Sequence, residues 1–558
     1  MKKIQFKKGA ILLKSRLLTV LIWMFVLGLI AVGCSSTETD VEKTTDTPED
    51  DTEQEEVAEE EEESEGEGED SMADELRFAI NAQPPTLDPL ISTADATRDV
   101  ILQVFEPLVT HNSSLQPEPM LAESFEESDD GKTITFNLRE GVKFHNGDEM
   151  TAEDVVVSME RWLEHSSRAK AAFSNATFEA EDDYTVLLKM EGPNRIALSV
   201  LSSPTQMPAI MPKEIVESAG EEGVDELIGT GPYKFEEWKQ DQYIKLTRFD
   251  DYQPSSDPSD GPAGKREAFI KDLYFMVVTD SSTRVAGIQT GEYDIAMQIP
   301  FDNYDQLEDD PNIKTYTAPD GFDLLVFNNK EGILADVTMR QAIAATLDLE
   351  AILHSALSNE VFYNLNPGLM LEEQTDWYSD AGKEVYNQQD LDKTEQLLEE
   401  AGYDGETITL LTSREYMNQY NASVVIKEQL EQAGMNVELE VYDWATVQEI
   451  RSDPSAYNAF ITGFSISTDP TQFIFLDSKN EWDGWTESDE IDRILDEIRS
   501  STTQEEAMEL NAELQEEFWS YLPGIKFGDK NFLYAISEDV EGFQDINGVM
   551  LWNVKKSN

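Results

Sequence analysis

The chain has 558 residues, with 41 basic and 114 acidic side chains and a formal net charge of -73. This acidic excess argues against a nucleic-acid-binding surface and against a face that lies on anionic lipid. It identifies no ligand, because a saline or alkaline habitat would also explain it. A single cysteine, Cys34, excludes an intramolecular disulfide and the usual Cys/His zinc patterns.

The N-terminal segment has the pattern of a secretory signal peptide. Basic residues up to Arg16 precede the charge-free run Leu17–Gly33, which is slightly shorter than the ~20 residues of a spanning helix. The small residues before Cys34 resemble the lipobox of bacterial lipoproteins, although Ala31 stands where Leu is more common. The resemblance implies that residues 1–33 are removed, that Cys34 is the lipid attachment site, and that the protein is extracytoplasmic and anchored to the cell membrane. The alternative is a stray cysteine at the end of a membrane helix.

Residues 34–75 are predicted to be an acidic, disordered tether. From Ser35 to Glu75 the chain carries 21 acidic residues and one base, Lys43. Such a segment buries too little apolar surface to offset the entropy of ordering, and its like charges extend it. Its expected role is a spacer that keeps the following domain away from the membrane.

The body of the chain, from Leu76 onward, is too long for one hydrophobic core, so two or more lobes are expected. Alternating apolar residues predict strands, and a capping pair such as Thr151 with Asp154 predicts the start of a helix. In chain order, the first half is predicted to contain a strand at 76–80 that enters a proline-rich loop, a helix at 99–106, a strand at 134–138, a helix from 152 to about 163, a strand at 184–190 and a hairpin within 232–249.

From about residue 320 the pattern changes to alternating strands and helices, which favours a second α/β lobe. The predicted elements are a strand at 323–329, a helical run at 338–357, a helix ended by Gly402, a strand at 407–413, a helix ended by Gly434, strands at 436–444 and 459–465, helices at 488–500 and 503–519, and strands in the tail after 524.

Five stretches occur in a recognisable order: "PPTLDP", "ITFNLREGVKFHNGDEMTAEDVVVSMERW", "GTGPYKFEEW", "MRQAIAATLD" and "LEQAGMNVELEVYDW". Together they resemble the extracellular solute-binding proteins of ABC importers, in the peptide/nickel/oligopeptide class known as family 5. The resemblance implies an α/β, two-lobed periplasmic-binding-protein-like fold with a hinge between the lobes and an extra subdomain in the first. It assigns 76–320 to lobe I with its inserted subdomain, 321–521 to lobe II and 522–558 to the return to lobe I. The strand at 323–329 would be one hinge crossing.

The same resemblance implies two walls of a ligand site, between which an extended peptide adds as a strand. One wall corresponds to Gln83, Pro84 and Pro85. The opposite wall corresponds to Thr462, Gly463 and Phe464.

Two charged partners of a peptide's ends are missing from this chain. Ile466 stands where some peptide-binding relatives carry an acid, and Phe460 where some carry an arginine. A buried ammonium group without a partner is costly. The amine is therefore met elsewhere, with Asp469 and Asp483 as candidates, or the ligand has no free terminus at this place.

Tryptophan side chains are the other candidates for ligand contact, because an indole ring gives a large contact area at a small entropic cost. Trp482 and Trp485 are predicted to stack on ligand, with packing in a core as the alternative. Tyr416 and Trp444 are weaker candidates.

No pattern of catalytic residues supports an enzyme. The four histidines lack the HExxH spacing, and Ser167 with Lys170 forms an SxxK match without a KTG partner. No cofactor is predicted, but a chelated metal held through one histidine stays open. We therefore expect a lipid-anchored, monomeric substrate-binding subunit that captures oligopeptides, or a similar small solute, for ABC permease and ATPase subunits. The alternatives are a peptide-sensing lipoprotein that feeds a signalling system and a binder of a non-peptide solute such as a chelated metal.

Overall fold

The computed structural model describes residues 73–557 apart from 174 and 221–222. Cys34, the predicted signal peptide 1–33 and nearly all of the predicted tether 34–75 lie outside these residues. Within them, no helix is both long and apolar enough to cross a membrane.

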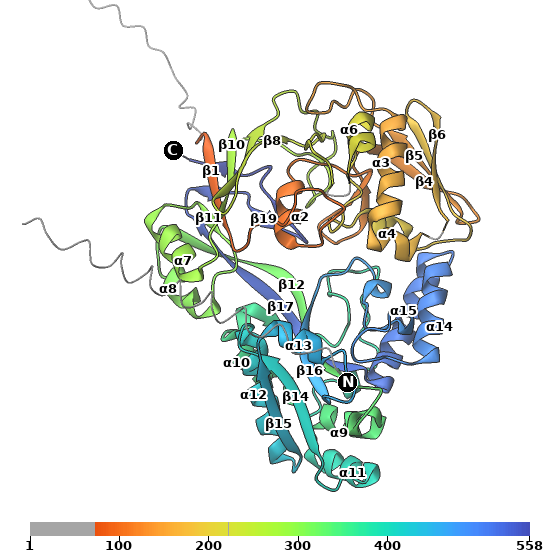
Figure 1. The fold of residues 1–558 in the computed structure, drawn as a ribbon, viewed down its shortest axis with the longest axis vertical. Coiled ribbons are helices and arrows are strands. Elements are labelled where there is room, and N and C mark those ends of the chain that lie inside the picture. Colours follow the sequence, from red (N-terminus) through yellow and green to blue (C-terminus); the bar gives the residue numbers. More distant parts are fainter. Residues whose placement is uncertain (1–72, 174, 221–222, 558) are drawn as a thin grey trace, which may run out of the picture. The chain divides into compact units, whose positions relative to one another are not determined.

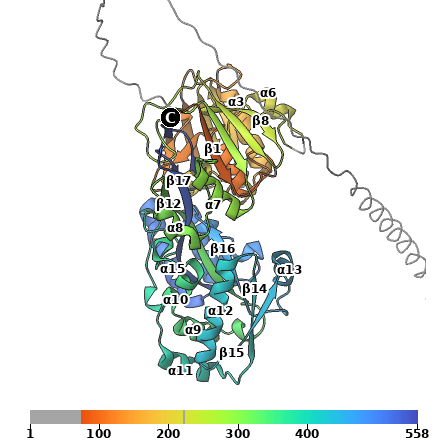
Figure 2. The ribbon, with the colours of Figure 1, turned by 90° about the vertical axis from the view of Figure 1, so that its left-hand side faces the viewer.

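The main sheet has eleven strands, in the order β15-β14-β16-β12-β17-β11-β1-β10-β9-β8, and β13 also pairs with β17. Its centre is the long antiparallel pair of β12 (Ile313–Phe327) and β17 (Gly524–Ser537), which lie side by side in Figures 1 and 2. The other strands are β1 (Glu75–Ile80), β8 (Tyr233–Lys239), β9 (Tyr243–Arg248), β10 (Asp272–Val277), β11 (Ile295–Ala296), β13 (Tyr363–Asn364), β14 (Thr407–Ser413), β15 (Asn436–Tyr442) and β16 (Ala459–Ser465).

One core joins the two ends of the described chain. Leu76, Phe78 and Ile80 of β1 are at most 1% exposed, as their alternation predicts, and they pack in one cluster with Trp552 from the C-terminal tail. Ala73 N donates to Lys556 O at 2.9 Å. The tail after β17 therefore completes the core that β1 begins. It contains β18 (Val540–Glu541), β19 (Gln544–Asp545), β20 (Val549–Met550) and β21 (Lys555–Lys556).

A second core belongs to the segment between β1 and β8. Here α3 (Ala152–His165) buries Val155, Met159 and Trp162 on a four-stranded antiparallel sheet, β4-β5-β7-β6. The predicted capping pair is confirmed, since Thr151 N donates to Asp154 Oδ2 at 2.9 Å. The elements of this part are β2 (Val109–His111), β3 (Pro117–Pro119), β4 (Ala122–Glu127), β5 (Thr133–Leu138), α4 (Ser167–Ala172), β6 (Thr177–Asp182), β7 (Thr185–Lys189), α5 (Ala197–Leu201) and α6 (Lys213–Ser218).

The third and largest core extends from Val285 and Leu307, which precede β12, along β12 itself and on to the part where helices cover β14, β15 and β16. The predicted helix ends are confirmed: Gly402 caps α11 with φ +71°, and α12 stops just before Gly434. The helices here and at the start of β12 are α7 (Ser281–Thr290), α8 (Tyr304–Glu308), α9 (Val337–Thr346), α10 (Leu349–Leu357), α11 (Leu391–Ala401), α12 (Met417–Gln432), α13 (Trp444–Ile450), α14 (Asp489–Ser500) and α15 (Gln504–Tyr521).

Two helix predictions were wrong in their bounds. The run at 338–357 is two helices, because Asp348 caps α10 by accepting from Ala351 N at 3.1 Å. The helix predicted at 99–106 is α2, Asp95–Ile101. The helix stops early because the carbonyl groups of Gln103 and Val104, just beyond its end, accept hydrogen bonds from the "GTGPY" segment and not from a further helical turn.

That segment also shows why two glycines are needed at this place. A Cβ atom on Gly229 would lie 2.2 Å from Val104 O, and one on Gly231 would lie 2.7 Å from Gln103 O. The same backbone holds His145, whose Nε2 donates to Gly231 O at 2.9 Å while its Nδ1 accepts from Gly229 N at 3.2 Å. Both ring nitrogens are therefore used in one neutral tautomer.

Acid is expected to weaken the fold through His145. Burial lowers the pKa of His145 from 6.5 to about 4, so its contribution is complete above pH 6.5 and is lost as the pH falls towards 4. Since the ring keeps some exposure, we expect a loss of about 2 kcal/mol in unfolding free energy over this range. Urea titrations at several pH values should show a smaller pH dependence for His145→Gln. The matched change at the exposed His354 should leave it unaltered, and equal slopes for all three proteins would contradict the assignment.

Candidate functional site

A cleft of about 710 Å³ opens beside the β12–β17 pair. On the side of the molecule that contains β1, the cleft is lined by Asp95 at the start of α2 and by the segment Gln298–Phe301. Tyr416, Trp444 and the end of β16 line it from the part that contains β14. Elements far apart in the sequence thus face one space across the shared strands.

The end of β16 offers an open strand edge to this cleft. β16 pairs with β12 over its full length, from Ala459 to Ser465, but with β14 only at Ala459 and Phe460. No described strand pairs with its other edge from Ile461 onward, and Thr462–Ser465 line the cleft. An extended chain could add to this edge through main-chain hydrogen bonds.

Gly463 keeps a charged cluster within reach of the cleft. A Cβ atom at this position would lie 3.0 Å from Asp323 Oδ1 and 3.2 Å from Lys530 Nζ. Lys530 Nζ lies 2.9 Å from Asp320 Oδ2 and 3.3 Å from Asp323 Oδ1. Asn418 adds a hydrogen bond of 2.9 Å to Asp323 Oδ2. The cluster sits where β12 shifts register against β17, on either side of Gly321 and Phe322.

The cluster places one amino group between two carboxyl groups. Burial alone would lower the pKa of Lys530, but the carboxylates of Asp320 and Asp323 outweigh burial and raise it, so the ammonium is charged. Burial raises the pKa of Asp320 while Lys530 opposes the shift. One ammonium therefore faces two carboxylates.

Aromatic rings form another part of the wall. Tyr416, which is 43% exposed, lies edge-to-face on Trp444 with ring centroids 4.9 Å apart. The neighbouring Glu415 also lines the cleft, and its Oε2 accepts from Trp444 N at 3.0 Å. The sequence ranked this aromatic pair below Trp482 and Trp485 as ligand contacts, yet it is Tyr416 and Trp444 that line this cleft.

The two predicted walls are placed differently. Thr462, Gly463 and Phe464 line the cleft as expected. Gln83, Pro84 and Pro85 follow the end of β1 and do not line it; Gln83 Nε2 donates to Gln240 Oε1 at 2.7 Å beside the β8–β9 turn. Ile466 lies just beyond the lining residues. Ligand contact at all of these positions stays a prediction.

Trp482 and Trp485 line a separate cavity of about 410 Å³, together with Lys330. Trp482 packs on Phe464 with ring centroids 5.6 Å apart, so it supports the back of the cleft wall. Asp483, a candidate partner for a ligand amine, instead pairs with Arg451 at 2.7 Å.

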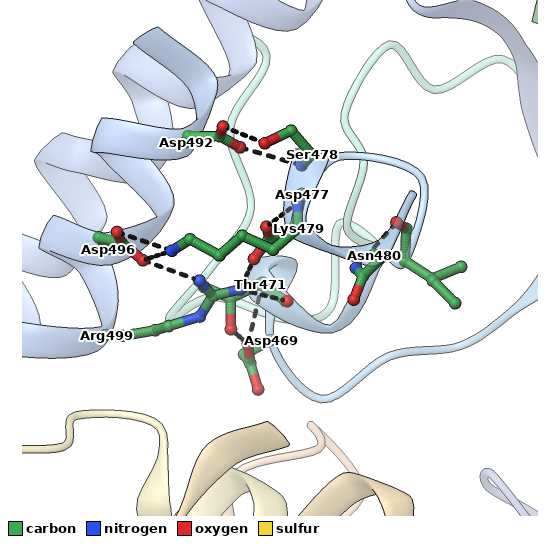
Figure 3. Close-up of polar contacts among 10 residues, drawn as sticks. Asp469, Thr471, Asp477, Ser478, Lys479, Asn480, Asp492, Asp496 and Arg499 are labelled. Carbon is green, nitrogen blue, oxygen red and sulfur yellow. Dashed lines mark hydrogen bonds and ion pairs between the residues drawn. The ribbon is translucent and has the colours of Figure 1, made fainter. Parts of the chain in front are cut away.

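Asp469, the other candidate partner, is completely buried and caps a short helical turn, η5 (Pro470–Gln472). Its Oδ1 accepts from Thr471 N at 2.9 Å and from Thr471 Oγ1 at 2.6 Å (Figure 3), and burial raises its pKa. Neighbouring groups thus already use both carboxylates, and neither residue lines the cleft. A contact between either one and a ligand amine stays a prediction.

The turn that Asp469 caps touches the β4–β7 subdomain. Gln472 accepts a hydrogen bond from Arg168 of α4, and Thr468 Oγ1 donates to Ser199 O at 3.1 Å. Behind it, ion pairs tie the following loop to α14 (Figure 3): Arg499 to Asp477 at 2.8 Å and Lys479 to Asp496 at 2.7 Å. Asp469 thus stabilises a turn that joins the third core to the β4–β7 subdomain.

Among the residues that the structure describes, no group of three or more His, Cys, Asp or Glu side chains is arranged to hold a metal ion. His111 and His145 are used in packing away from the cleft, and burial lowers the pKa of each to about 4. The cleft contains charged, amide and aromatic groups suited to binding a polar solute.

Comparison with known proteins adds independent findings. A family model described as "Bacterial extracellular solute-binding proteins, family 5 Middle" matches residues 116–484. A probable peptide ABC transporter periplasmic-binding protein of Sinorhizobium fredii is 30% identical over 493 residues, covering 84% of this chain and 91% of the relative. The oligopeptide-binding protein AppA of Bacillus subtilis is 26% identical over 505 residues, covering 85% and 89%.

Two solved structures, each 25% identical, have similar folds. AppA of Bacillus subtilis with a nonapeptide gives a TM-score of 0.67 over 85% of this chain and 97% of that chain. AgaA of A. tumefaciens with agropinic acid gives 0.69 over 87% and 99%. The expected two-lobed α/β fold is confirmed by these neighbours.

Proposed function

Because the chain belongs to family 5 of the bacterial extracellular solute-binding proteins, we propose that it is the lipid-anchored substrate-binding subunit of an ABC importer. In this role it captures oligopeptides between two lobes and delivers them to a membrane permease and its ATPase. The family consists of binding proteins and not of enzymes, so the ligand leaves chemically unchanged.

The observation that carries the peptide assignment is the open edge of β16 in a cleft of about 710 Å³. A peptide main chain supplies the alternating donors and acceptors that such an edge pairs with, whereas most small solutes do not. A non-peptide solute stays the second candidate, because the similar AgaA structure holds agropinic acid.

The proposed lobes are 76–320 with 522–558, and 321–521. The register shifts of β12 near Gly321 support a hinge at this boundary, since a break in strand pairing allows local bending. Ligand held between the lobes would then favour the closed state. The proposed anchor, Cys34, rests on the signal-peptide pattern, and the protein acts as a monomer in this scheme. A peptide-sensing role would use the same site.

Native mass spectrometry of the full chain, purified in detergent, tests the assignment. We expect co-purified peptides, and isothermal titration of the emptied protein with short peptides of several lengths should give saturable binding. X-ray scattering should show contraction on binding. If only a non-peptide solute co-purifies and no peptide binds, the peptide assignment fails.

A further inference from the structure

The ionisable side chains of the cleft are unbalanced in charge. Asp95, Asp320 and Glu415 line it, and Lys530 is the one base among the described lining residues. The charge of Lys530 is already shared by Asp320 and Asp323. A ligand carboxylate therefore meets no unshared cation here, whereas a ligand cation meets several acids.

Glu415 is the acid most available to a ligand. Asp95 pairs with Arg98 at 2.9 Å, and Asp320 pairs with Lys530. Glu415 is exposed and uses Oε2 for the Trp444 N–H, with no cation of the described chain within ion-pair distance. The adjacent Arg414 points instead to the ring of Tyr420, 4.9 Å from its centroid.

The aromatic pair beside Glu415 has the second property that a cation needs. Tyr416 and Trp444 both line the cleft, and π faces attract ammonium and guanidinium groups. Arg451 lies over Trp444, 5.9 Å from a ring centroid, but its charge is compensated by Asp483. A carboxylate beside an exposed tyrosine ring and a half-buried tryptophan ring, at the wall of a cleft, suits the end of a lysine or arginine side chain.

Resting on the proposed function, we propose that this cleft selects peptides with a basic side chain, which Glu415, Tyr416 and Trp444 receive while the peptide main chain lies along β16. The subsite sits next to the open edge, in the same cleft as Gly463 and Phe464. The selectivity is electrostatic, so it weakens as the salt concentration rises.

Isothermal titration of the full chain with peptides that differ only in one residue, Lys, Gln or Glu, tests this at each position in turn. At one position we expect the Lys peptide to bind about tenfold more tightly than the Gln peptide, and the Glu peptide more weakly still. Glu415→Gln should reduce the Lys preference several-fold. The matched control Glu399→Gln, in exposed α11, should leave it unchanged.

Each outcome decides a different question. Equal binding of the three peptides at every position overturns the basic-peptide inference but leaves the importer subunit in place. A Lys preference that survives Glu415→Gln overturns the assigned subsite. If no peptide binds the unaltered chain, the proposed function itself fails, and the inference fails with it.

Discussion

Replacing Gly463 with leucine is expected to weaken peptide binding about 100-fold, or about 2.7 kcal/mol, without unfolding the protein. Gly463 is exposed at the open edge of β16, where the ligand main chain would lie. Its φ is outside the left-handed region, so leucine can adopt the same backbone. The added side chain fills the space above Asp323 and Lys530. It thereby blocks the strand edge along which the extended ligand would form its main-chain hydrogen bonds.

Titration calorimetry and thermal melting together check this expectation. Gly192→Leu is the matched control, because a Cβ atom there meets nothing within 4 Å and the residue lies outside the cleft. It should bind peptide as the unaltered chain does. Affinity within a few-fold of normal for Gly463→Leu would show that ligand does not use this edge.

The second large effect concerns stability. Lys530→Met should lower the unfolding free energy by about 3–5 kcal/mol, since it leaves two carboxylates close together without their cation. The side chains involved are at most 15% exposed, so water screens them little. Urea denaturation at neutral pH measures the loss directly.

Two further variants show whether charge is the cause. Adding Asp320→Asn and Asp323→Asn to Lys530→Met should restore most of the stability, because the uncompensated charges are removed. Lys383→Met breaks an exposed pair with Asp380 and should change stability by less than about 1 kcal/mol. Equal losses from Lys530→Met and Lys383→Met would contradict the buried-cluster account.

Elements with a strong local signal could be predicted from the sequence. The helix α3 has both a capping pair and an apolar face, and β1 has clean alternation, so both were found with nearly correct positions. The early end of α2 could not be found this way, because the partners of Gln103 and Val104 lie more than a hundred residues further along the chain.

The site was predicted only in part, and for a similar reason. The resemblance located the β16 wall, but Asp320 and Lys530 are far apart in the sequence, and acidic residues are too frequent for any one to stand out. The capping role of Asp469 could not be read from the sequence, because it depends on Thr471 being turned back onto the carboxylate. The register shifts around Gly321 could have been predicted from "PDGFD", because the alternating strand pattern is interrupted there.

The hydrogen bond between Ala73 and Lys556 brings the first and the last described residues of the chain close together. A short loop could therefore join them, and new termini could be opened at an exposed turn elsewhere, giving a circular permutant with the same core.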